Sequence, residues 1–338
     1  MRLVALALAA LLVAACGSSS SRPQPRDTTL VLDFTPNPVH TGIYAALAQH
    51  LDQDAGFRLH LVAPTASTDS IKLLETGRTD FAILDIHDLA IARERGQDVV
   101  GIMAIVERPL AAVLAAPNIG RPRQLPGQTV GITGVPSDTA VLDSIVSGDG
   151  GDPRRLKTIT IGFNAVPDLL SGKVEAAVGF WNDEGVTLTH RRPGFHVFRV
   201  DRYGAPAYPE LVVCATSAAL RRDPGRASAL VRVLTRGYQL TLFDPKRSAA
   251  ELEHLVPGLD PALVTQQLGA LLPAFRAPDG QVGELDPAML RRWAAWEARF
   301  GIVRRPPDVQ AAFDTSLVTN VADSRAIRER GTTRSNPA

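Results

Sequence analysis

The chain has 338 residues, of which 45% are hydrophobic and 21% charged, and its 36 basic and 35 acidic residues leave a net charge of +1. This is the composition of an ordinary globular protein of about two domains, which excludes a wholly disordered chain and a collagen-like fibre. The near-zero net charge argues against a nucleic-acid partner, because such partners usually require a basic surface.

The start of the chain has the pattern of an export signal that ends in a cysteine. Arg2 precedes an uninterrupted apolar run over residues 3–15, which closes in the letters VAAC at 13–16. The run is too short to cross a bilayer, which needs about 20 residues, but it suits the apolar core of a secretory signal. The closing letters resemble the bacterial lipobox, in which the cysteine is acylated. We therefore expect a signal peptide at 1–15 and a lipid on Cys16 that anchors the protein at the outer face of a membrane.

The segment after this signal is expected to be a tether. Residues 16–26 are small, polar and proline-containing, as in flexible linkers. Cys214 is the one other cysteine, so no disulfide within the chain can form once Cys16 carries lipid. Cys214 lies in the apolar run 211–215, where a buried, inert thiol is expected.

From residue 27 onward, short apolar runs alternate with amphipathic stretches, which indicates βα units and a mostly parallel sheet. This alternation of expected strands and helices begins again near residue 128, and after residue 215 the chain is expected to be almost wholly helical. We expect strands at 29–34, 57–63, 80–85, 99–106, 110–116, 128–133, 158–162, 176–180, 195–200 and 211–215. We expect helices at 42–51, 67–75, 87–95, 137–146, 166–171, 226–243, 248–255, 261–272, 287–300 and 308–317.

This alternation predicts two α/β lobes. Residues 27–115 and 212–317 would form the first lobe, 116–211 the second lobe, and 318–338 a flexible tail. The chain would cross between the lobes twice, and the two crossings would form a hinge with the ligand between the lobes.

Motifs for nucleotides, metals and covalent catalysis are absent from the sequence. It contains no GxxxxGK[ST], no GxGxxG after a strand, no HExxH and no GxSxG. The spacing of its seven histidines gives no zinc pattern. We therefore expect no catalysis, no metal and no cofactor.

The most informative segment joins the first expected strand to the first helix, at residues 33–44 (DFTPNPVHTGIY). In open α/β sheets, ligands bind at the carboxyl ends of strands, beside helix N-termini. Asn37 offers a donor and an acceptor and His40 a switchable group, while Phe34 and Tyr44 offer aromatic faces. The segment is either a ligand-binding loop or a proline-rich turn capped by Asn37.

The pattern D-[FW]-x-P-N-x-x-H-x-G-x-Y in this segment is typical of solute-binding proteins of bacterial ABC importers for thiamine pyrimidine precursors, and the chain resembles that family. Residues 130–138 (VGITGVPSD), 179–185 (GFWNDEG) and 203–211 (YGAPAYPEL) resemble further segments of it. The resemblance implies an α/β, two-lobed type II periplasmic-binding-protein fold with a ligand cleft between the lobes. It also implies an ABC permease and its ATPase as partners.

The family also includes fungal enzymes that make the pyrimidine, and these carry a cysteine-rich iron motif. This chain has one cysteine beyond the lipobox, which argues against that iron chemistry. A synthase-like enzyme is the alternative of another class. Phe34 stands where the family often has an indole, so a flavin precursor remains an alternative ligand. Sulfonate and nitrate, which relatives of the same fold bind, remain alternatives as well. A sensory module with a separate signalling partner is the third hypothesis.

Later loops agree with a heteroaromatic ligand. Trp181 ends a strand and is followed by Asn182 and Glu184, so a pyrimidine ring could stack on the indole while the carboxylate accepts from an exocyclic amine. Ser137 either caps the helix that follows or also faces a polar substituent. Asp85, His87 and Asp88 follow the strand at 80–85, and either one of them faces the cleft or they cap the next helix.

We therefore predict an extracytoplasmic, lipid-anchored, monomeric binding protein that captures a hydroxymethylpyrimidine-type precursor and makes no bond. The predicted ligand contacts are Phe34, Asn37, His40, Tyr44, Asp85, Ser137, Trp181, Asn182 and Glu184.

Overall fold

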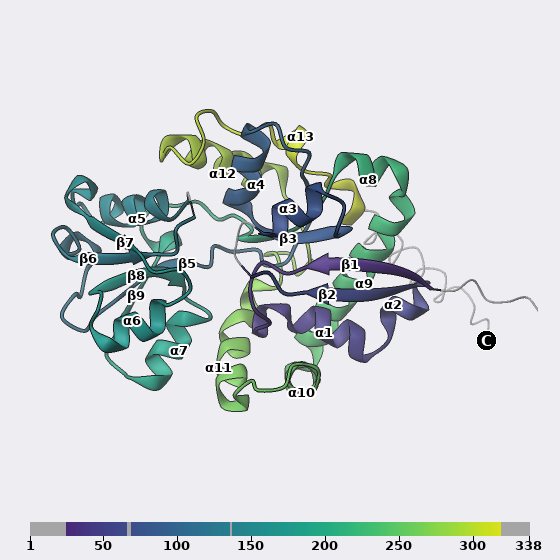
Figure 1. Ribbon diagram of the computed structural model, residues 1–338, viewed down its shortest axis with the longest axis horizontal. Coiled ribbons are helices and arrows are strands. Elements are labelled where there is room, and N and C mark those ends of the chain that lie inside the picture. Colours follow the sequence, from purple (N-terminus) through teal and green to yellow (C-terminus); the bar gives the residue numbers. More distant parts are fainter. Residues whose placement is uncertain (1–24, 66–68, 136, 319–338) are drawn as a thin grey trace, which may run out of the picture.

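Two five-stranded sheets organise the chain into two lobes, which lie side by side in Figure 1. The computed structural model describes residues 25–65, 69–135 and 137–318. The predicted signal peptide and Cys16, with most of the predicted tether and tail, lie outside these residues. None of the described helices is both long and apolar enough to cross a membrane. The two-lobed α/β fold predicted from the sequence is confirmed.

The first sheet combines strands from distant parts of the chain. In spatial order they are β2 (Phe57–Val62), β1 (Arg26–Val31), β3 (Phe81–Asp85), β10 (Leu211–Ala215) and β4 (Val100–Ala104). β1 runs parallel to β2 and β3, whereas β10 runs antiparallel to β3 and β4. β10 returns from the second lobe without a crossover helix, and only a parallel connection requires such a crossover.

The second sheet has the same mixed character. Its spatial order is β7 (Lys157–Thr160), β6 (Thr129–Ile132), β8 (Ala176–Phe180), β5 (Ala111–Ala115) and β9 (His196–Arg199). β6 is parallel to β7 and β8, while β5, the first strand after the chain leaves the first lobe, is antiparallel to β8 and β9. The expectation of mostly parallel sheets is therefore wrong for β5 and β10, the strands that directly follow the two crossings.

Helices cover both faces of each sheet (Figure 1). On one side of the first sheet lie α1 (Thr41–Ala48), α2 (Leu51–Asp54), α9 (Pro224–Phe243), α10 (Pro245–Leu255) and α11 (Pro261–Leu271). On its other side lie α3 (Asp69–Glu75), α4 (Ile86–Glu94), α12 (Pro287–Arg299) and α13 (Val309–Ala312), and α8 (Ser217–Arg222) leads into α9. In the second lobe, α5 (Ser137–Gly148) lies opposite α6 (Ala165–Ser171) and α7 (Glu184–Arg191).

The helices depart from the expectation in three main places, besides shifts of a few residues at other helix ends and the unexpected α8. His50 adopts a left-handed conformation with φ of 55°, so the helix expected at 42–51 is divided into α1 and α2. The helix expected at 308–317 is the short α13, because Phe313 instead forms a β-bridge with Gly101. α7 was not expected, because it begins inside the segment 179–185, which was interpreted as a loop at a strand end.

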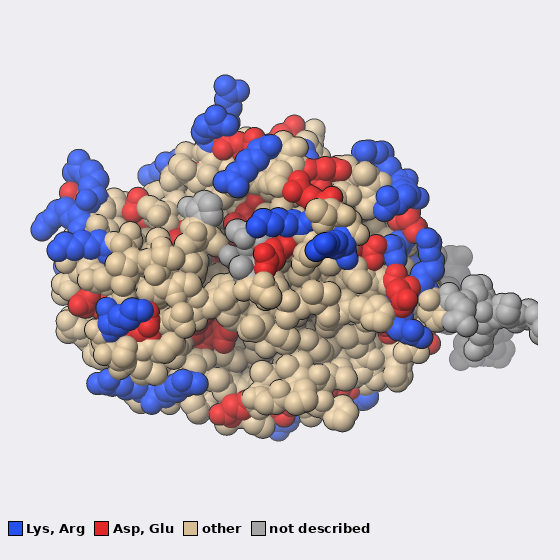
Figure 2. Space-filling model, in the orientation of Figure 1, with Lys and Arg blue, Asp and Glu red and all other residues tan. Residues whose placement is uncertain are grey.

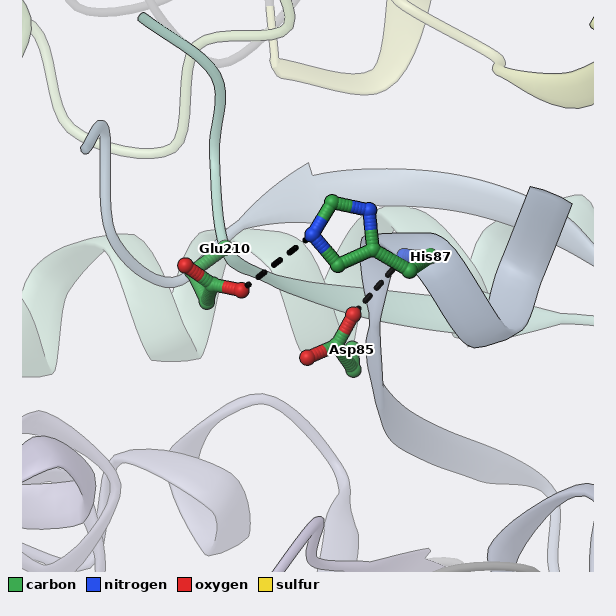
Figure 3. A group of neighbouring side chains, drawn as sticks. All are labelled: Asp85, His87 and Glu210. Atoms are coloured by element: carbon green, nitrogen blue, oxygen red, sulfur yellow. Dashed lines mark hydrogen bonds and ion pairs between the residues drawn. The ribbon is translucent and has the colours of Figure 1, made fainter. Parts of the chain in front are cut away.

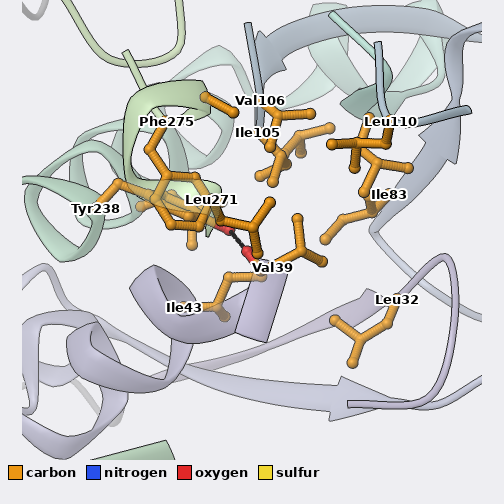
Figure 4. Packing of buried hydrophobic residues seen from close by; sticks show 14 of the residues in the cluster. Leu32, Val39, Ile43, Ile83, Ile105, Val106, Leu110, Tyr238, Leu271 and Phe275 are labelled. Carbon is orange, nitrogen blue, oxygen red and sulfur yellow. Dashed lines mark hydrogen bonds between the residues drawn. The ribbon is translucent and has the colours of Figure 1, made fainter. Parts of the chain in front are cut away.

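A close helix crossing holds the loop after β1 in place. A Cβ on Gly237 of α9 would lie 1.9 Å from the carbonyl oxygen of Gly42 in α1, and a Cβ on Gly42 would meet the ring of Tyr238 at 2.4 Å. Both positions therefore need glycine for the two helices to approach so closely. The hydroxyl of Tyr238 donates to the carbonyl oxygen of Val39 at 2.8 Å, within the core of Figure 4. The crossing thereby anchors the loop whose other residues reach the site.

Candidate ligand-binding site

A cavity of about 110 Å³ lies between the two lobes, at the carboxyl ends of their parallel strands. The loops after β1, β3, β6 and β8 reach it, as do the starts of β5 and β10. Ligands of open α/β sheets bind at this edge, where strand ends and helix starts leave backbone groups free. The volume is several times the ~30 Å³ share of one water in the liquid, so the cavity suits a small molecule.

The wall of this cavity is acidic. Among the described residues that line it, none is Lys or Arg. On the outer face shown in Figure 2, by contrast, Lys and Arg are interspersed with Asp and Glu. An acidic wall favours a ligand that offers hydrogen-bond donors or positive charge. The carboxyl groups of the wall belong to Asp33, Asp85, Asp88, Asp138, Asp183, Glu184 and Glu210.

The loop after β1 presents Asp33 and Asn37 to the cavity. Asn37 caps the short 3-10 helix η1 (Pro38–His40), and its side-chain oxygen accepts from the N–H of Val39 at 2.9 Å. His40 is fully buried, with Nδ1 accepting from the N–H of Asn37 at 3.2 Å and Nε2 lying 2.8 Å from Asp33 Oδ1. Because Nδ1 is an acceptor, Nε2 carries the proton and donates to Asp33. His40 thus fixes the carboxylate of Asp33 toward the cavity.

The loop between β8 and α7 presents Asn182, Asp183 and Glu184. Asn182 is 2% exposed, and its Oδ1 has no hydrogen-bond partner among the described residues. Glu184 Oε2 accepts from the N–H of Phe180 at 2.9 Å. Burial, with the neighbouring Asp183, raises the pKa of Glu184 to about 7. An unpaired buried polar group costs about 1–3 kcal/mol, so Asn182 gains most from a ligand that donates to it.

Aromatic faces in the wall come from Phe34, Phe163 and Phe180. Phe34 follows β1 in the first lobe, and Phe163 follows β7 in the second. Their rings meet edge to face, with centroids 4.6 Å apart and planes at 85°. The Phe34–Phe163 pair therefore spans the gap between the lobes beside the cavity.

Three predicted contact residues lie outside the cavity lining: His40, Tyr44 and Trp181. The indole N–H of Trp181 donates to the carbonyl oxygen of Pro109 at 2.9 Å, and the Arg199 guanidinium lies 4.1 Å from the ring centroid. Stacking by Trp181 on a ligand would require the indole to leave both partners. Tyr44, a residue of α1, is buried in the core of the first lobe. The predicted residues that do line the cavity are Phe34, Asn37, Asp85, Ser137, Asn182 and Glu184.

Several residues of the wall have no role predicted from the sequence, among them four acids and Phe163. The four acids lie in the segments at 33–44, 130–138, 179–185 and 203–211 and could have been found there, because each lies beside a strand end. Phe163 gave no such signal, since it follows an edge strand of ordinary composition. These five residues are Asp33, Asp138, Phe163, Asp183 and Glu210.

Three of the residues that line the cavity, Asp85, His87 and Glu210, form a cluster of ionisable side chains (Figure 3). Nδ1 of His87 is hydrogen-bonded to Glu297, and Nε2 lies 3.3 Å from the hydroxyl of Tyr208 and 3.7 Å from Glu210 Oε1. Burial alone would lower the pKa of His87, but the surrounding carboxylates, Glu297 first, outweigh it and raise the pKa to about 10. Burial also raises the pKa of Asp85 well above its ordinary value. The cluster thus holds several acids around one imidazole.

Glu210 of this cluster joins the two segments that cross between the lobes. It lies directly before β10, on the returning crossing. Its Oε2 accepts from the N–H of Ala111 at 2.9 Å and from the N–H of Leu110, at the end of the outgoing crossing. One carboxylate therefore holds both crossings in a fixed relation.

A second contact between the lobes depends on Gln267 of α11, a helix that packs on α10 and η1 and also on α7. Its Nε2 donates to Asp183 Oδ1 at 2.5 Å and to Thr187 Oγ1 at 3.2 Å. We expect Gln267→Ala to weaken ligand binding about three- to ten-fold, because one or two hydrogen bonds of about 1 kcal/mol each no longer favour closure. Calorimetric titration with the ligand measures this change.

The matched control for that experiment is Gln266→Ala. Gln266 Oε1 lies 3.2 Å from His190 Nδ1 in an exposed contact between the same two helices. An exposed hydrogen bond competes with water and contributes little, so this variant should bind as tightly as the parent. Equal weakening by both variants would contradict the role of Gln267.

Glu107, on the outgoing crossing, makes folding stability depend on pH. It is 4% exposed, and burial, helped by the charges of Glu284 and Asp279, raises its pKa from 4.5 to about 8. Between these values the folded state keeps a proton that the unfolded state has lost, so stability from this group falls as pH rises from about 4.5 to 8. We expect Glu107→Gln to remove part of this decline, which denaturant unfolding at pH 5 and pH 8.5 measures. Parallel pH profiles for the variant and the parent would contradict it.

The double crossing, the two mixed sheets and the cavity between them define a two-lobed solute-binding fold. The alkanesulfonate-binding protein SsuA from Xanthomonas axonopodis pv. citri bound to MOPS has this fold, with a TM-score of 0.67 and 15% identity over 86% of this chain and 99% of that one. The periplasmic nitrate-binding protein NrtA from Synechocystis PCC 6803 has a TM-score of 0.68 and 11% identity, with 89% of each chain covered. At such identities the likeness shows the fold alone.

The family described as NMT1/THI5 like matches residues 37–248, and the chain belongs to this family. Formylaminopyrimidine-binding protein of Halalkalibacterium halodurans is 28% identical over 326 residues, covering 93% of this chain and 98% of the relative. 4-Amino-5-hydroxymethyl-2-methylpyrimidine phosphate synthase of Legionella pneumophila is 23% identical over 252 residues, covering 73% and 79%. The resemblance inferred from residues 33–44 is therefore confirmed.

Proposed function

We propose that this protein binds a small aminopyrimidine, of the formylaminopyrimidine or hydroxymethylpyrimidine kind, and delivers it to an ABC permease without making or breaking a bond. The observation that carries the proposal is the cavity wall, which has seven carboxyl groups and no described Lys or Arg. An aminopyrimidine offers an exocyclic amine that donates and a ring nitrogen that can take up a proton, and carboxylates suit both. The formylaminopyrimidine-binding relative supports the same ligand class.

The wall disfavours the anionic alternatives. Sulfonate and nitrate sites need cationic or N–H donor groups. Here no arginine or lysine is among the described wall residues, and the cationic imidazole of His87 is already paired with Glu297 and Glu210. A flavin precursor fits the wall chemistry better, but its fused rings demand more room than a single pyrimidine ring does. The aminopyrimidine is therefore the ligand class that both charge and size favour.

An enzymatic alternative rests on the synthase relatives. Its support in this chain is weak, because the one described cysteine, Cys214, is buried in β10 and burial raises the pKa of its thiol well above the ordinary value. A protonated thiol with no access to the cavity neither attacks a substrate nor ligates iron. Ligand binding and delivery account for the site without any catalytic role.

The test is calorimetry of the purified protein with formylaminopyrimidine, hydroxymethylpyrimidine, riboflavin, an alkanesulfonate and nitrate. Mass spectrometry of ligand released from natively purified protein identifies what the site holds. We expect one aminopyrimidine per chain and no binding of the anions. Tight binding of an anion without any aminopyrimidine would overturn the ligand class and leave the fold intact.

We also propose that a lipid on Cys16, which lies outside the described residues, anchors the protein to a membrane. Cys16→Ala should abolish incorporation of labelled fatty acid and release the protein from the membrane fraction, because acylation needs the thiol. Cys214→Ala is the matched control, and it should label like the parent. Labelling of Cys16→Ala at the parental level would remove the lipoprotein claim.

A further inference from the structure

We propose that Asp85, His87 and Glu210 form a binding site for one divalent cation of the zinc class in the wall of the cavity (Figure 3). This site goes beyond the proposed pyrimidine binding and does not depend on it. Its three ligands come from the end of β3, the start of α4 and the residue before β10. No local spacing in the sequence could have revealed them.

The geometry brings three donor atoms together. One ligand atom from each residue lies within 4.8 Å of the other two, and His87 Nε2 is 3.7 Å from Glu210 Oε1. Because β3 pairs with β10, Asp85 lies opposite Leu211. Glu210, the residue before Leu211, is thereby held beside the carboxylate of Asp85. Bonds of about 2.0–2.2 Å from zinc to oxygen or nitrogen place neighbouring ligands about 3–3.5 Å apart. The His87 and Glu210 donor atoms are already close to that spacing, and the Asp85 carboxylate would have to move toward them.

The surrounding contacts orient the donors as a metal site requires. Glu297 holds Nδ1 of His87, which leaves Nε2 directed at the cluster, as in carboxylate–histidine–metal arrangements. Glu210 Oε2 is occupied by the N–H groups of Leu110 and Ala111. Its other oxygen, Oε1, has no hydrogen-bond partner among the described residues although the side chain is fully buried. His87 Nε2 lies 3.7 Å from this oxygen, too far to donate a hydrogen bond to it, and a cation placed between the two atoms would coordinate both.

Charge balance points the same way. The acids Asp85, Glu210 and Glu297 converge on the single imidazole of His87, and Oε2 of Glu297 is also buried without a described partner. A cation bound between these groups would replace the proton on Nε2 of His87 and place positive charge among the buried acids. A divalent cation neutralises two carboxylates at once.

The donor set defines the kind of cation. One imidazole nitrogen with two carboxylate oxygens suits zinc and, less tightly, manganese or ferrous iron, whereas calcium and magnesium prefer oxygen ligands in larger number. Asp85 and His87 also line the cavity. The fourth coordination position therefore opens toward the space where a water or a ligand atom lies.

The experiment is titration of the full chain, freed of metal with a chelator, with zinc chloride in the absence of any pyrimidine. We expect one zinc per chain, and Asp85→Asn should lower the affinity about tenfold or more, because an amide oxygen is a poorer ligand. Cobalt substitution should give visible d–d absorption without a thiolate charge-transfer band. Circular dichroism checks folding, and since Asp85 is only partly buried this variant is chosen over His87→Ala.

Two matched variants separate this site from others. Asp138→Asn removes a wall carboxyl outside the cluster, and His60→Gln removes the exposed pair of His60 with Asp27. Both should bind zinc like the parent. Absence of stoichiometric zinc binding, or zinc affinity unchanged in Asp85→Asn, overturns the proposal and indicates that protons alone balance the cluster. Pyrimidine affinity measured with chelator present reports on the proposed function separately.

Discussion

Replacing Asn182 or Glu184 by alanine will weaken aminopyrimidine binding roughly ten- to a hundred-fold. Asn182 Oδ1 is a buried acceptor with no described partner, and Glu184 is the carboxylate beside it in the wall. Each substitution removes the acceptor for one N–H group of the ligand. That N–H group is then buried without a partner in the cavity, which costs about 1–3 kcal/mol. Isothermal titration calorimetry with the ligand identified by mass spectrometry measures the loss.

The control for these variants is Asp143→Asn, which removes a partly buried carboxyl of α5 that is not in the wall. It should bind the ligand as the parent does. Glu184→Gln adds a test of charge, because it keeps an oxygen for the N–H of Phe180 but has no negative charge. Parental affinity in both alanine variants, with folding intact, would show that the β8–α7 loop is not part of the site.

Gly237→Ala will lower the free energy of unfolding by about 2–3 kcal/mol. The new Cβ would overlap the carbonyl oxygen of Gly42, a backbone atom that cannot rotate away, so α1 and α9 must separate. Overpacking of this kind costs about 1–3 kcal/mol or more, which exceeds the gain of up to about 1 kcal/mol in helix propensity. Urea unfolding monitored by circular dichroism measures the difference.

Gly269→Ala in α11 is the matched control, because a Cβ there meets no atom within 4 Å. It should leave stability unchanged or raise it by up to about 1 kcal/mol. Because the α1–α9 crossing anchors Val39 through Tyr238, Gly237→Ala should also weaken ligand binding. Equal stability of the two variants would contradict the close crossing.

Much of the fold could be predicted because its signals are local. Apolar runs and their punctuation located the strands near their observed positions, and the loop at 33–44 was placed at a strand end that does reach the cavity. The antiparallel direction of β5 and β10 could not be predicted. Each strand enters its sheet from the other lobe, and its direction depends on where that crossing meets the sheet. His50 divided a helix through one left-handed residue that no pattern marks.

The orientation of site residues was harder to predict than their position. Trp181 lies next to Phe180 at the strand end, yet its indole is directed to Pro109 and Arg199, partners 72 and 18 positions away in the chain. The cluster around His87 likewise depends on Glu210 and Glu297, which only the tertiary fold brings near. Side-chain direction is decided by such long-range contacts, which a single sequence does not display.

The contact between Phe34 and Phe163 has a consequence for the rate at which ligand exchanges. Separating the lobes breaks this edge-to-face pair, and such pairs contribute about 0.5–1.5 kcal/mol. The closed arrangement is therefore favoured about two- to ten-fold by these two rings even before ligand arrives. Where a ligand enters and leaves by separation of the lobes, this aromatic contact therefore lengthens the residence time of the bound molecule.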